Sequence, residues 1–346
     1  MEIGNHKIGP GAAVYIVAEL SANHAHRFER AVEIIQLAKD AGADAVKLQT
    51  YTPDTMTLDS RREEFCISGG TIWDGRNLHD LYREAYTPWD WQPKLKKVAE
   101  DLGLDLFSSA FDSTAVDFLE TMDVPAYKLA SFELVDLPLI EKMARTRKPL
   151  IMSTGMATVE EIEEALQTAR QAGATQIALL KCTSAYPAQD DEMNLRTLPE
   201  MEKRFGLPVG LSDHTMGIAV PVAAVALGAC IIEKHLTLSR SIPGPDSAFS
   251  LEPSEFKAMV GAVRSAEKAL GKVHFGLSEK EKASRAHRRS LFVVADMKKN
   301  AQFTTANVRS IRPGHGLHTR HLQEVLGRHA SRDIERGTPL AWDLIV

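Results

Sequence analysis

The segment Leu207–Asp246 reads LPVGLSDHTMGIAVPVAAVALGACIIEKHLTLSRSIPGPD and decides the fold. Two apolar runs within it end near histidines, His214 and His235, which lie 21 positions apart. This spacing suits one strand, a returning helix and a second parallel strand, so both imidazoles are expected at the carboxyl ends of neighbouring strands. Neutral imidazole is the commonest metal ligand, and the turn Pro243-Gly244-Pro245-Asp246 would bring a carboxylate over the same mouth. The segment therefore indicates a divalent metal site, the alternative being two hydrogen-bonded loop histidines.

Composition excludes several classes of protein. At 346 residues the chain exceeds the usual size of one compact core, so one large and one small domain are expected. The formal net charge of −5 gives no electrostatic basis for binding nucleic acid or an acidic membrane. No apolar run is long enough to span a bilayer, and the polar N-terminus lacks the apolar core of a signal peptide. The three cysteines are too scattered for a disulfide framework, so a reduced, cytoplasmic protein is the simplest interpretation.

The first 270 residues alternate between eight apolar, strand-like runs and eight segments of helical periodicity. Several helical segments are followed by glycine, as in Ala41-Gly42-Ala43, where a left-handed residue ends a helix at least cost. Eight such units predict an α/β fold, a (β/α)8 TIM barrel whose parallel strands are buried on both faces. The expected strands are 15–20, 45–50, 104–108, 126–129, 149–153, 176–181, 208–212 and 229–234, and the expected helices are 28–41, 89–102, 114–121, 137–145, 159–172, 194–205, 218–227 and 254–270.

An open doubly wound sheet is the alternative architecture. It predicts a glycine-rich turn after the first strand, where the phosphates of a dinucleotide would bind. Residues 19–26 contain no glycine, so the dinucleotide-binding interpretation fails and the closed barrel is preferred.

In a barrel of this kind the chemistry lies at the carboxyl ends of the strands, so the polar residues there are expected to surround one mouth. A single lysine at a strand end is more often a solvated charge, and a single serine is more often a helix cap. Two lysines beside several hydroxyls at one rim instead suit a small anion that carries phosphate and carboxylate, which predicts a phosphorylated acid as substrate. The residues concerned are Glu19, Lys47, Gln49, Lys128, Ser131, Glu133, Ser153, Lys181, Ser184 and Tyr186.

Six short motifs follow one another along the chain: Ala18-Glu19 with Ala22-Asn23-His24, Lys47-Leu48-Gln49-Thr50, Tyr127-Lys128-Leu129-Ala130-Ser131, Leu211-Ser212-Asp213-His214-Thr215, Glu233-Lys234-His235 and Pro243-Gly244-Pro245-Asp246. Together they resemble the sialic acid synthase family over nearly the whole chain. The resemblance implies a TIM barrel enzyme that condenses phosphoenolpyruvate with an N-acylated amino sugar to make a nine-carbon 2-keto acid. It also implies a divalent metal cofactor, usually manganese in vitro, with magnesium or cobalt as alternatives.

The resemblance also suggests roles for the residues of the rim. His214 and His235 would hold the metal, and Glu133 would transfer a proton. The carboxylates Glu19, Glu233 and Asp246 would act beside it and, with Gln49 and Tyr186, orient the sugar. Phosphate and carboxylate would be bound by Lys47, Lys128, Ser131, Ser153, Ser184 and Ser212. The chain departs from the family pattern at Ala25-His26, where a glycine is usual, and at Ser184, where asparagine is common.

A long insertion follows the second expected strand, at residues 51–88. It resembles the pseudaminic acid branch of the family, rather than the N-acetylneuraminic or legionaminic acid branches. Such a loop is seldom structureless unless it is functional, and Trp73, Tyr82 and Tyr86 offer apolar walls at the mouth. These walls would suit a 6-deoxy sugar such as 2,4-diacetamido-2,4,6-trideoxy-β-L-altropyranose, which carries a methyl group in place of a hydroxyl. The alternative is that the aromatic residues only pack the loop down.

Residues 1–270 are expected to form the barrel, 271–284 a linker and 285–346 a second unit. A unit this small has a small core of its own and is expected to lean on another surface. It resembles the family's antifreeze-like (SAF) domain, which closes the barrel mouth of the partner subunit, so the resemblance implies a domain-swapped homodimer. Arg312 then matches the arginine that reaches the sugar's N-acyl group, the alternative being a solvated basic loop. The basic cluster Arg285–Arg289 is isolated in an acidic chain and gives little reason to expect nucleic acid.

Two other classes of function remain open from the sequence. A metal-dependent aldolase, or another synthase that uses phosphoenolpyruvate, would employ much the same rim, because a fold does not determine a function. Such an enzyme has no evident need for the C-terminal unit or for Arg312. A non-catalytic binding module would tolerate replacement of the rim lysines and histidines.

Overall fold

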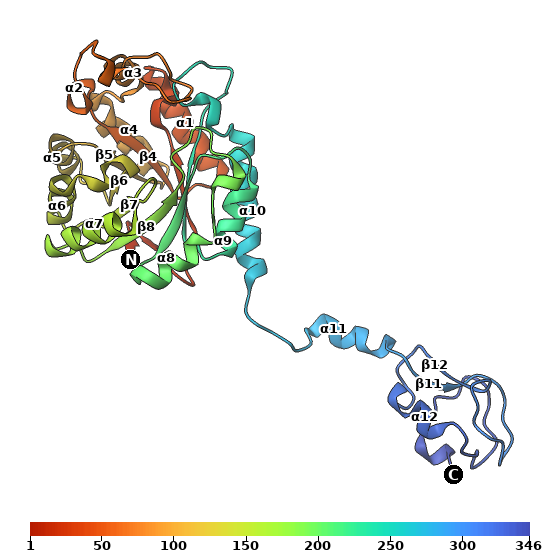
Figure 1. Cartoon of the computed structure of the whole chain (residues 1–346). Helices are drawn as coiled ribbons and strands as arrows, with labels where there is room; N and C mark the ends of the chain where they lie inside the picture. Colours follow the sequence, from red (N-terminus) through yellow and green to blue (C-terminus); the bar gives the residue numbers. More distant parts are fainter. The chain divides into compact units, whose positions relative to one another are not determined.

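The computed structural model describes all 346 residues, which form two compact units, Met1–Gly271 and Lys272–Val346. The first unit contains eight parallel strands: β3 (Tyr15–Glu19), β4 (Ala45–Thr50), β5 (Asp105–Ala110), β6 (Tyr127–Leu129), β7 (Leu150–Ser153), β8 (Ile177–Cys182), β9 (Val209–Asp213) and β10 (Ile231–His235). They follow one another around a closed barrel, in which β10 pairs with β3 (Figure 1). The predicted (β/α)8 barrel is therefore confirmed.

The strands are buried on both faces because helices cover the outside of the barrel and side chains fill its inside. Every residue of β3, β9 and β10 is buried. Successive side chains alternate between the inner and the outer face of a strand. The register pairs His235 with Glu19 and Lys234 with Asp213, so neighbouring residues on β10 serve opposite faces of the barrel wall.

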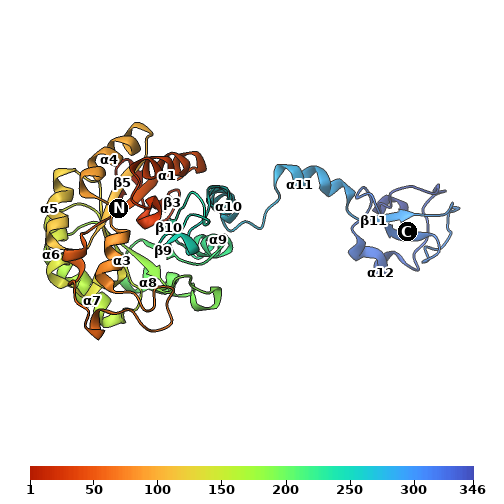
Figure 2. The ribbon, with the colours of Figure 1, turned by 90° about the horizontal axis from the view of Figure 1, so that it is seen from above.

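A helix follows each strand, and Figure 2 shows these helices as a ring around the barrel. Each turns an apolar stripe inward; α1, for example, buries Ala31, Ile34, Ile35 and Ala38, which share one helical face. No helix in the chain combines the length and the hydropathy that crossing a bilayer requires. The helices are α1 (Phe28–Ala41), α4 (Gln92–Asp101), α5 (Ser113–Thr121), α6 (Leu137–Arg145), α7 (Val159–Gln171), α8 (Thr197–Phe205), α9 (Ala219–Ala226) and α10 (Pro253–Leu270).

A short hairpin that sequence patterns did not predict covers the amino end of the barrel. Its strands are β1 (Glu2–Ile3) and β2 (His6–Lys7). The backbone N–H of Glu2 donates to Gln176 just before β8, while His6 Nδ1 lies 2.9 Å from Asp105 Oδ2 at the start of β5. The hairpin therefore bridges strand beginnings on two sides of the barrel.

The insertion after β4 contains two short helices, α2 (Pro53–Met56) and α3 (Leu78–Ala85), which lie at the end of the barrel where the strands finish (Figure 1). Residues 57–77 between them are called the mouth loop below. The first barrel loop touches α3: His26 Nε2 lies 3.1 Å from Arg83 O, and its ring lies 5.0 Å from that of Tyr86. Ala25 and His26 both adopt left-handed backbone angles, with φ of 46° and 52°. His26 thus contacts the insertion from a backbone conformation that favours glycine.

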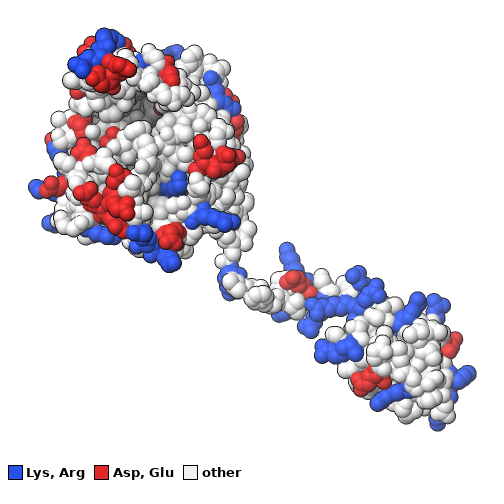
Figure 3. Space-filling model, in the orientation of Figure 1, with Lys and Arg blue, Asp and Glu red and all other residues white.

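The C-terminal unit is built around a two-stranded antiparallel sheet, β11 (Ser290–Val293) and β12 (Val308–Ile311), with α12 (Leu322–Val325). Its core is apolar and includes Leu291, Phe303 and Val325. The predicted linker contains a short helix, α11 (Glu279–Ser284). Ser278 and Glu281 form a capping box that stabilises its start. Lys and Arg outnumber Asp and Glu by 14 to 7 in residues 272–346, and blue predominates on this unit in Figure 3.

Candidate active site

Alternating charges lie inside the barrel at the carboxyl ends of the strands. Lys47 on β4 pairs with Glu19 on β3, and its Nζ lies 3.5 Å from Oε1 of Glu233 on β10. Lys128 Nζ on β6 lies 3.9 Å from the same Glu233 oxygen. All four side chains are almost completely buried. Because the four charges balance, two lysines can be kept out of water next to the mouth.

Burial and neighbouring charge shift the pKa values in this group in different directions. Burial raises the pKa of Glu19 to about 7, although Lys47 opposes the shift. Burial also favours the neutral form of Glu233, but Lys128 and Lys47 outweigh it and hold its pKa below the usual value. Burial lowers the pKa of Lys128. Glu233 is therefore the carboxylate of the group that stays ionised at neutral pH. Glu19 is the carboxyl that can take up a proton near neutral pH.

The ends of β6, β7 and β8 surround Lys128 with small polar groups, called the anion cradle below and made of Ser131, Ser153, Gly155 and Ser184. Lys128 Nζ donates to Ser153 Oγ over 2.7 Å, and the Gly155 N–H donates to Ser131 Oγ over 3.1 Å. A Cβ on Gly155 would overlap Ser184 Oγ and lie 2.8 Å from Ser131 Oγ, so glycine leaves room for both hydroxyls. Hydroxyl and ammonium donors in this arrangement suit phosphate and carboxylate oxygens.

His214 and His235 stand beside each other, with ring centroids 5.4 Å apart. Nδ1 of His214 lies 3.1 Å from Thr183 O, which makes this nitrogen the donor and leaves Nε2 free to ligate. Burial lowers the pKa of His235 well below its usual value, so this imidazole is neutral, and its buried Nδ1 has no hydrogen-bond partner. Glu233 Oε2 is likewise buried without a partner.

These features fit a divalent metal. Two adjacent imidazoles near a carboxylate, with other positions open, form a donor set that suits first-row metal ions. The structure contains no cluster of three or more His, Cys, Asp or Glu side chains arranged to hold an ion. Any ion held by this pair would take its other ligands from substrate or water.

A second hydrogen-bonded group lies toward the turn that carries Asp246. Gln49 Nε2 donates to Ser21 Oγ over 2.9 Å and approaches Glu19 Oε1 at 3.4 Å. The Ser21 hydroxyl in turn contacts the Asp246 carboxylate, which also accepts from the N–H of Ala22. The turn is thereby joined to the first barrel loop, as its rigid sequence suggested.

Glu133 follows β6 in a 3-10 turn, Ser131–Val135. Burial raises its pKa to about 7, and its Oε2 has no hydrogen-bond partner. A carboxyl with both properties can accept or donate a proton near neutral pH. On the opposite wall Ser212 Oγ donates to Glu233 Oε1 over 3.2 Å, which adds this hydroxyl to the buried charges.

Aromatic rings line the outer side of the histidine pair. The ring of Tyr186 lies 4.6 Å from His214, and the ring of Phe249 lies 5.0 Å from His235. Trp73, in the mouth loop, completes the row at 5.4 Å from Tyr186. One side of the site is therefore polar and cationic, and the other is apolar.

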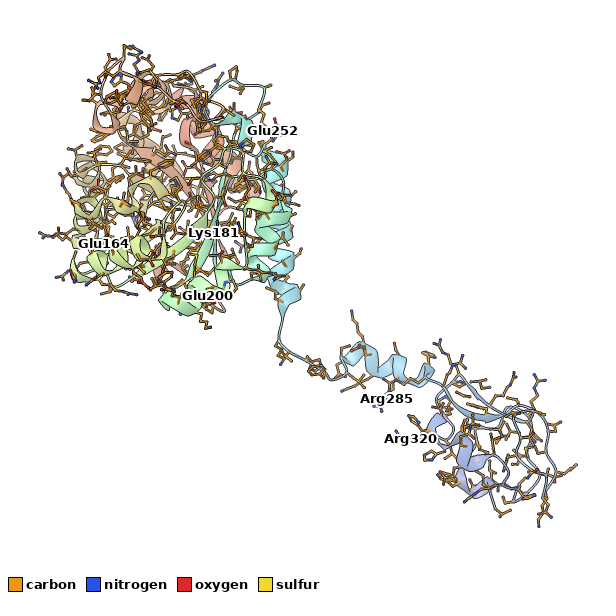
Figure 4. All side chains as sticks on the ribbon, in the orientation of Figure 1. Glu164, Lys181, Glu200, Glu252, Arg285 and Arg320 are labelled. Carbon is orange, nitrogen blue, oxygen red and sulfur yellow. The ribbon has the colours of Figure 1, made fainter.

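Two of the candidate residues predicted from the sequence, Lys181 and Arg312, lie apart from the buried charges at the barrel mouth. Lys181, labelled in Figure 4, donates to Cys182 O and Thr183 Oγ1 at 3.0 and 3.1 Å and forms no ion pair with the glutamates. Arg312 is exposed on the C-terminal unit. All other candidate residues lie around the carboxyl ends of the barrel strands.

Sequence reasoning missed several groups at the mouth. Ser109 accepts a hydrogen bond from Lys47 Nζ over 3.0 Å, and its place at the end of β5 was a signal that could have found it. Buried Cys182, with its Sγ 3.9 Å from His214 Nδ1, also ends a strand. Ser21 and Gly155 also follow strand ends, but their importance depends on side chains from other strands, which the sequence does not show.

Comparison with known proteins places the chain among sugar acid synthases. The model of the NeuB family matches residues 34–275, and that of the SAF domain matches residues 288–346. The chain is 47% identical to the pseudaminic acid synthase of Campylobacter jejuni strain 81-176 over 98% of both chains. It is 46% identical to that of Helicobacter pylori over 95% of this chain and 96% of the relative. The solved N-acetylneuraminic acid synthetase of Leptospira borgpetersenii, crystallised with citrate, superposes with a TM-score of 0.73 at 30% identity, covering 82% of this chain and 94% of that one.

Proposed function

The chain belongs to the NeuB family, and on that premise we propose that it is a pseudaminic acid synthase. It condenses phosphoenolpyruvate with 2,4-diacetamido-2,4,6-trideoxy-β-L-altropyranose and releases phosphate. One observation carries the proposal: Glu233 approaches both buried lysines and lies on the same strand as His235, so the lysines and the histidine pair adjoin at β10. A phosphorylated acid and a polarised aldehyde can meet there.

The anion cradle binds phosphoenolpyruvate in this proposal. Lys128 supplies charge, while Ser131, Ser153 and Ser184 supply hydroxyl donors to the phosphate and carboxylate oxygens. Lys47 and Ser212 contribute from the adjoining wall, where both contact carboxylates. Lys47, Lys128, Ser153 and Ser212 are buried, which strengthens the charge-assisted hydrogen bonds that they make.

His214 and His235 would hold Mn²⁺, Mg²⁺ or Co²⁺, which when bound polarises the sugar aldehyde as a Lewis acid and can activate water. The protein's own contribution there is orientation. Thr183 O fixes the tautomer of His214, and the neutral state of His235 keeps its lone pair available. Glu19, Gln49 and Asp246 orient the sugar through the hydrogen-bonded group at the turn.

The reaction forms one carbon–carbon bond and breaks one carbon–oxygen bond. The enol carbon of phosphoenolpyruvate attacks the aldehyde carbon, and the aldehyde oxygen takes up a proton, for which Glu133 is the nearby titratable group. Positive charge then develops at C2, where the anionic Glu233 stabilises it. Water adds at C2 and loses one proton, which gives a C2 hydroxyl. Phosphate then leaves with the electrons of the C2–O bond and takes up the proton of that hydroxyl, which becomes the ketone oxygen of the 2-keto acid.

A second copy of the chain completes the site in this proposal. Residues 1–271 carry 39 acidic against 27 basic residues, whereas residues 272–346 carry 7 against 14, and this opposite net charge supports the proposal. The barrel rim also exposes Phe132, Val135 and Met156, apolar side chains that an SAF domain of the partner would cover. Arg312 would then reach the sugar's N-acyl group from the partner, as a domain-swapped homodimer requires.

The test is phosphate release from phosphoenolpyruvate with manganese present. We expect release with 2,4-diacetamido-2,4,6-trideoxy-β-L-altropyranose and none with N-acetylmannosamine or without acceptor. Release with N-acetylmannosamine alone would keep the enzyme class and overturn the choice of sugar. If metal-loaded protein that is shown to be folded released no phosphate with either acceptor, the proposal would be overturned.

A further inference from the structure

The mouth loop is a folded structure with a defined tip. Asn77 Nδ2 at its base donates to Ser60 O over 2.6 Å, and Ile67 and Arg76 pair through the Ile67 N–H over 2.8 Å. Near the tip, the Asp74 carboxylate accepts from the backbone N–H groups of Gly70 and Thr71 over 2.7 and 2.9 Å. This turn presents Trp73, which is partly exposed, in a fixed position.

Trp73 reaches from the loop to the far side of the mouth. Its indole Nε1–H donates to Pro245 O over 3.0 Å, across 172 positions of sequence. Pro245 precedes Asp246, whose carboxylate contacts Ser21, so the indole is tied to a turn that already faces the site. The position of Trp73 therefore depends on two rigid turns, one at each end of this bond.

The indole continues an apolar surface that starts at the histidine pair. Its ring lies 5.4 Å from Tyr186 and 6.3 Å from Phe249, and these two rings lie 5.1 Å from each other. Tyr186 and Phe249 then contact His214 and His235. The three aromatic residues, Trp73, Tyr186 and Phe249, are called the aromatic wall below.

We propose that Trp73 is a specificity-determining residue, whose indole face receives the deoxygenated, methyl-bearing end of the acceptor sugar. The inference rests on the proposed function and deepens it. The sugar's reacting carbon must lie near the histidine pair, while phosphoenolpyruvate fills the anion cradle on the β6–β8 side. The rest of the sugar then extends toward the aromatic wall and the Asp246 turn.

The wall distinguishes methyl from hydroxyl because its outermost residue has no free hydrogen-bonding group. The single donor of Trp73 is already engaged by Pro245 O, so the indole presents only carbon to the ligand. A methyl group gains contact there, whereas a hydroxyl group loses its water without replacement. An apolar pocket of this kind rejects an added hydroxyl by no more than about a hundredfold.

The experiment compares two acceptors that differ by one oxygen, the 2,4-diacetamido-2,4,6-trideoxy sugar and its 6-hydroxy counterpart. The measured quantity is the ratio of their kcat/KM values in manganese-loaded enzyme. We expect Trp73→Ala to lower the preference for the deoxy sugar about tenfold, mainly through KM of the acceptor. Trp73→Phe, which keeps a ring, should retain most of the preference. Ile72→Ala changes a neighbouring exposed side chain of the same loop and serves as the matched control.

A readout that does not depend on turnover accompanies the kinetics. Trypsin can cut the mouth loop after Arg61, Arg62 or Arg76, and loss of the Trp73–Pro245 bond should speed this cleavage several-fold. The Ile72→Ala protein should be cut at the wild-type rate. If Trp73→Ala fails to fold, Trp73→Gln replaces it, since an amide at this place should raise relative acceptance of the hydroxyl sugar.

The outcomes separate the two proposals. Wild-type protein active on the deoxy sugar, combined with an unchanged ratio in Trp73→Ala and Trp73→Gln, overturns the role of Trp73 and leaves the function intact. Wild-type protein inactive on both sugars overturns the proposed function, and the inference falls with it. A lowered ratio in Trp73→Ala together with an unchanged ratio in Ile72→Ala supports the inference.

Discussion

The barrel buries charged side chains, whereas the C-terminal unit keeps them at its surface. The barrel buries six charged side chains near the carboxyl ends of its strands: Glu19, Lys47, Lys128, Asp213, Glu233 and Lys234. In the C-terminal unit Ser290 is the only buried polar residue, and ion pairs such as Lys298–Asp333 lie in solvent. Burying charge costs stability, and a fold retains it chiefly where shifted charges serve chemistry. This difference in where charges lie indicates that the chemistry takes place in the barrel. The C-terminal unit has charged residues only at its surface, around an apolar core.

The largest expected effect comes from an ion pair on the outer face of the barrel wall. Lys234 Nζ lies 2.5 Å from Asp213 Oδ2, and both side chains are fully buried directly behind the histidine strands. Lys234→Met leaves Asp213 uncompensated and should destabilise the barrel by about 3–5 kcal/mol, measured by urea unfolding. Lys298→Met, which breaks an exposed pair, should leave the transition unchanged.

A partner substitution tests the cause of that loss. Lys234→Met combined with Asp213→Asn removes the second charge and keeps the oxygen that accepts from Thr215 N–H. Part of the lost stability should return. If the single Lys234→Met protein were as stable as wild type, buried charge would not distinguish the two units.

The second prediction concerns catalysis. Lys128→Ala removes the central cation of the anion cradle and should lower kcat/KM for phosphate release by about a hundred- to a thousandfold. Lys298→Ala, at an exposed lysine of the C-terminal unit, is the matched control and should retain wild-type activity. Equal losses in the two variants would contradict the assignment of chemistry to the barrel.

The third prediction uses pH. The pKa of Glu133 is raised from 4.5 to about 7, so between these values the folded protein holds a proton that the unfolded chain has lost. Stability contributed by this carboxyl is therefore present at low pH and is lost as pH rises toward 7. Glutamine cannot titrate, so the stability of Glu133→Gln relative to wild type should rise by about 1–3 kcal/mol between pH 5 and pH 8.

Unfolding experiments at the two pH values check this result. Glu200→Gln on α8, whose exposed side chain is labelled in Figure 4, is the control for a carboxyl outside the mouth. A pH-independent difference between Glu133→Gln and wild type would remove Glu133 from consideration as the proton-transfer group.

The smallest expected effect is at Gly155. Its replacement by alanine places a methyl group against the hydroxyls of Ser131 and Ser184 and should raise KM for phosphoenolpyruvate about tenfold through one displaced hydrogen bond. Gly261→Ala on α10 adds the same methyl group where nothing lies within 4 Å, and should leave KM unchanged. If Gly155→Ala and Gly261→Ala had similar KM values for phosphoenolpyruvate, the anion cradle would not require a glycine at position 155.

The barrel was predictable because apolar runs and helical periodicity are local signals. The positions of Lys47, Lys128 and His235 followed from the rule that chemistry lies at strand ends. That rule could not find Gly155, whose value is the absence of a side chain between two other strands. Neither could it reveal that Trp73 bonds to Pro245, since nothing in a loop sequence specifies its partner 172 positions away.

The departure at Ala25-His26 shows why some features need the three-dimensional structure. Family resemblance presented it as an irregularity in the first loop. In the fold the His26 imidazole contacts Arg83 O and Tyr86, so the first barrel loop and the insertion hold each other in place. Left-handed angles at two residues other than glycine are thereby maintained by contacts that lie far away in sequence.

The hairpin at the amino end of the barrel ties the start of the chain to strands that come much later in the sequence. The Glu2 N–H donates to Gln176 and His6 lies beside Asp105, across 174 and 99 positions of sequence. Contacts this distant in sequence form only when the strands that carry them are in place. The first residues of the chain therefore report on whether the barrel is folded.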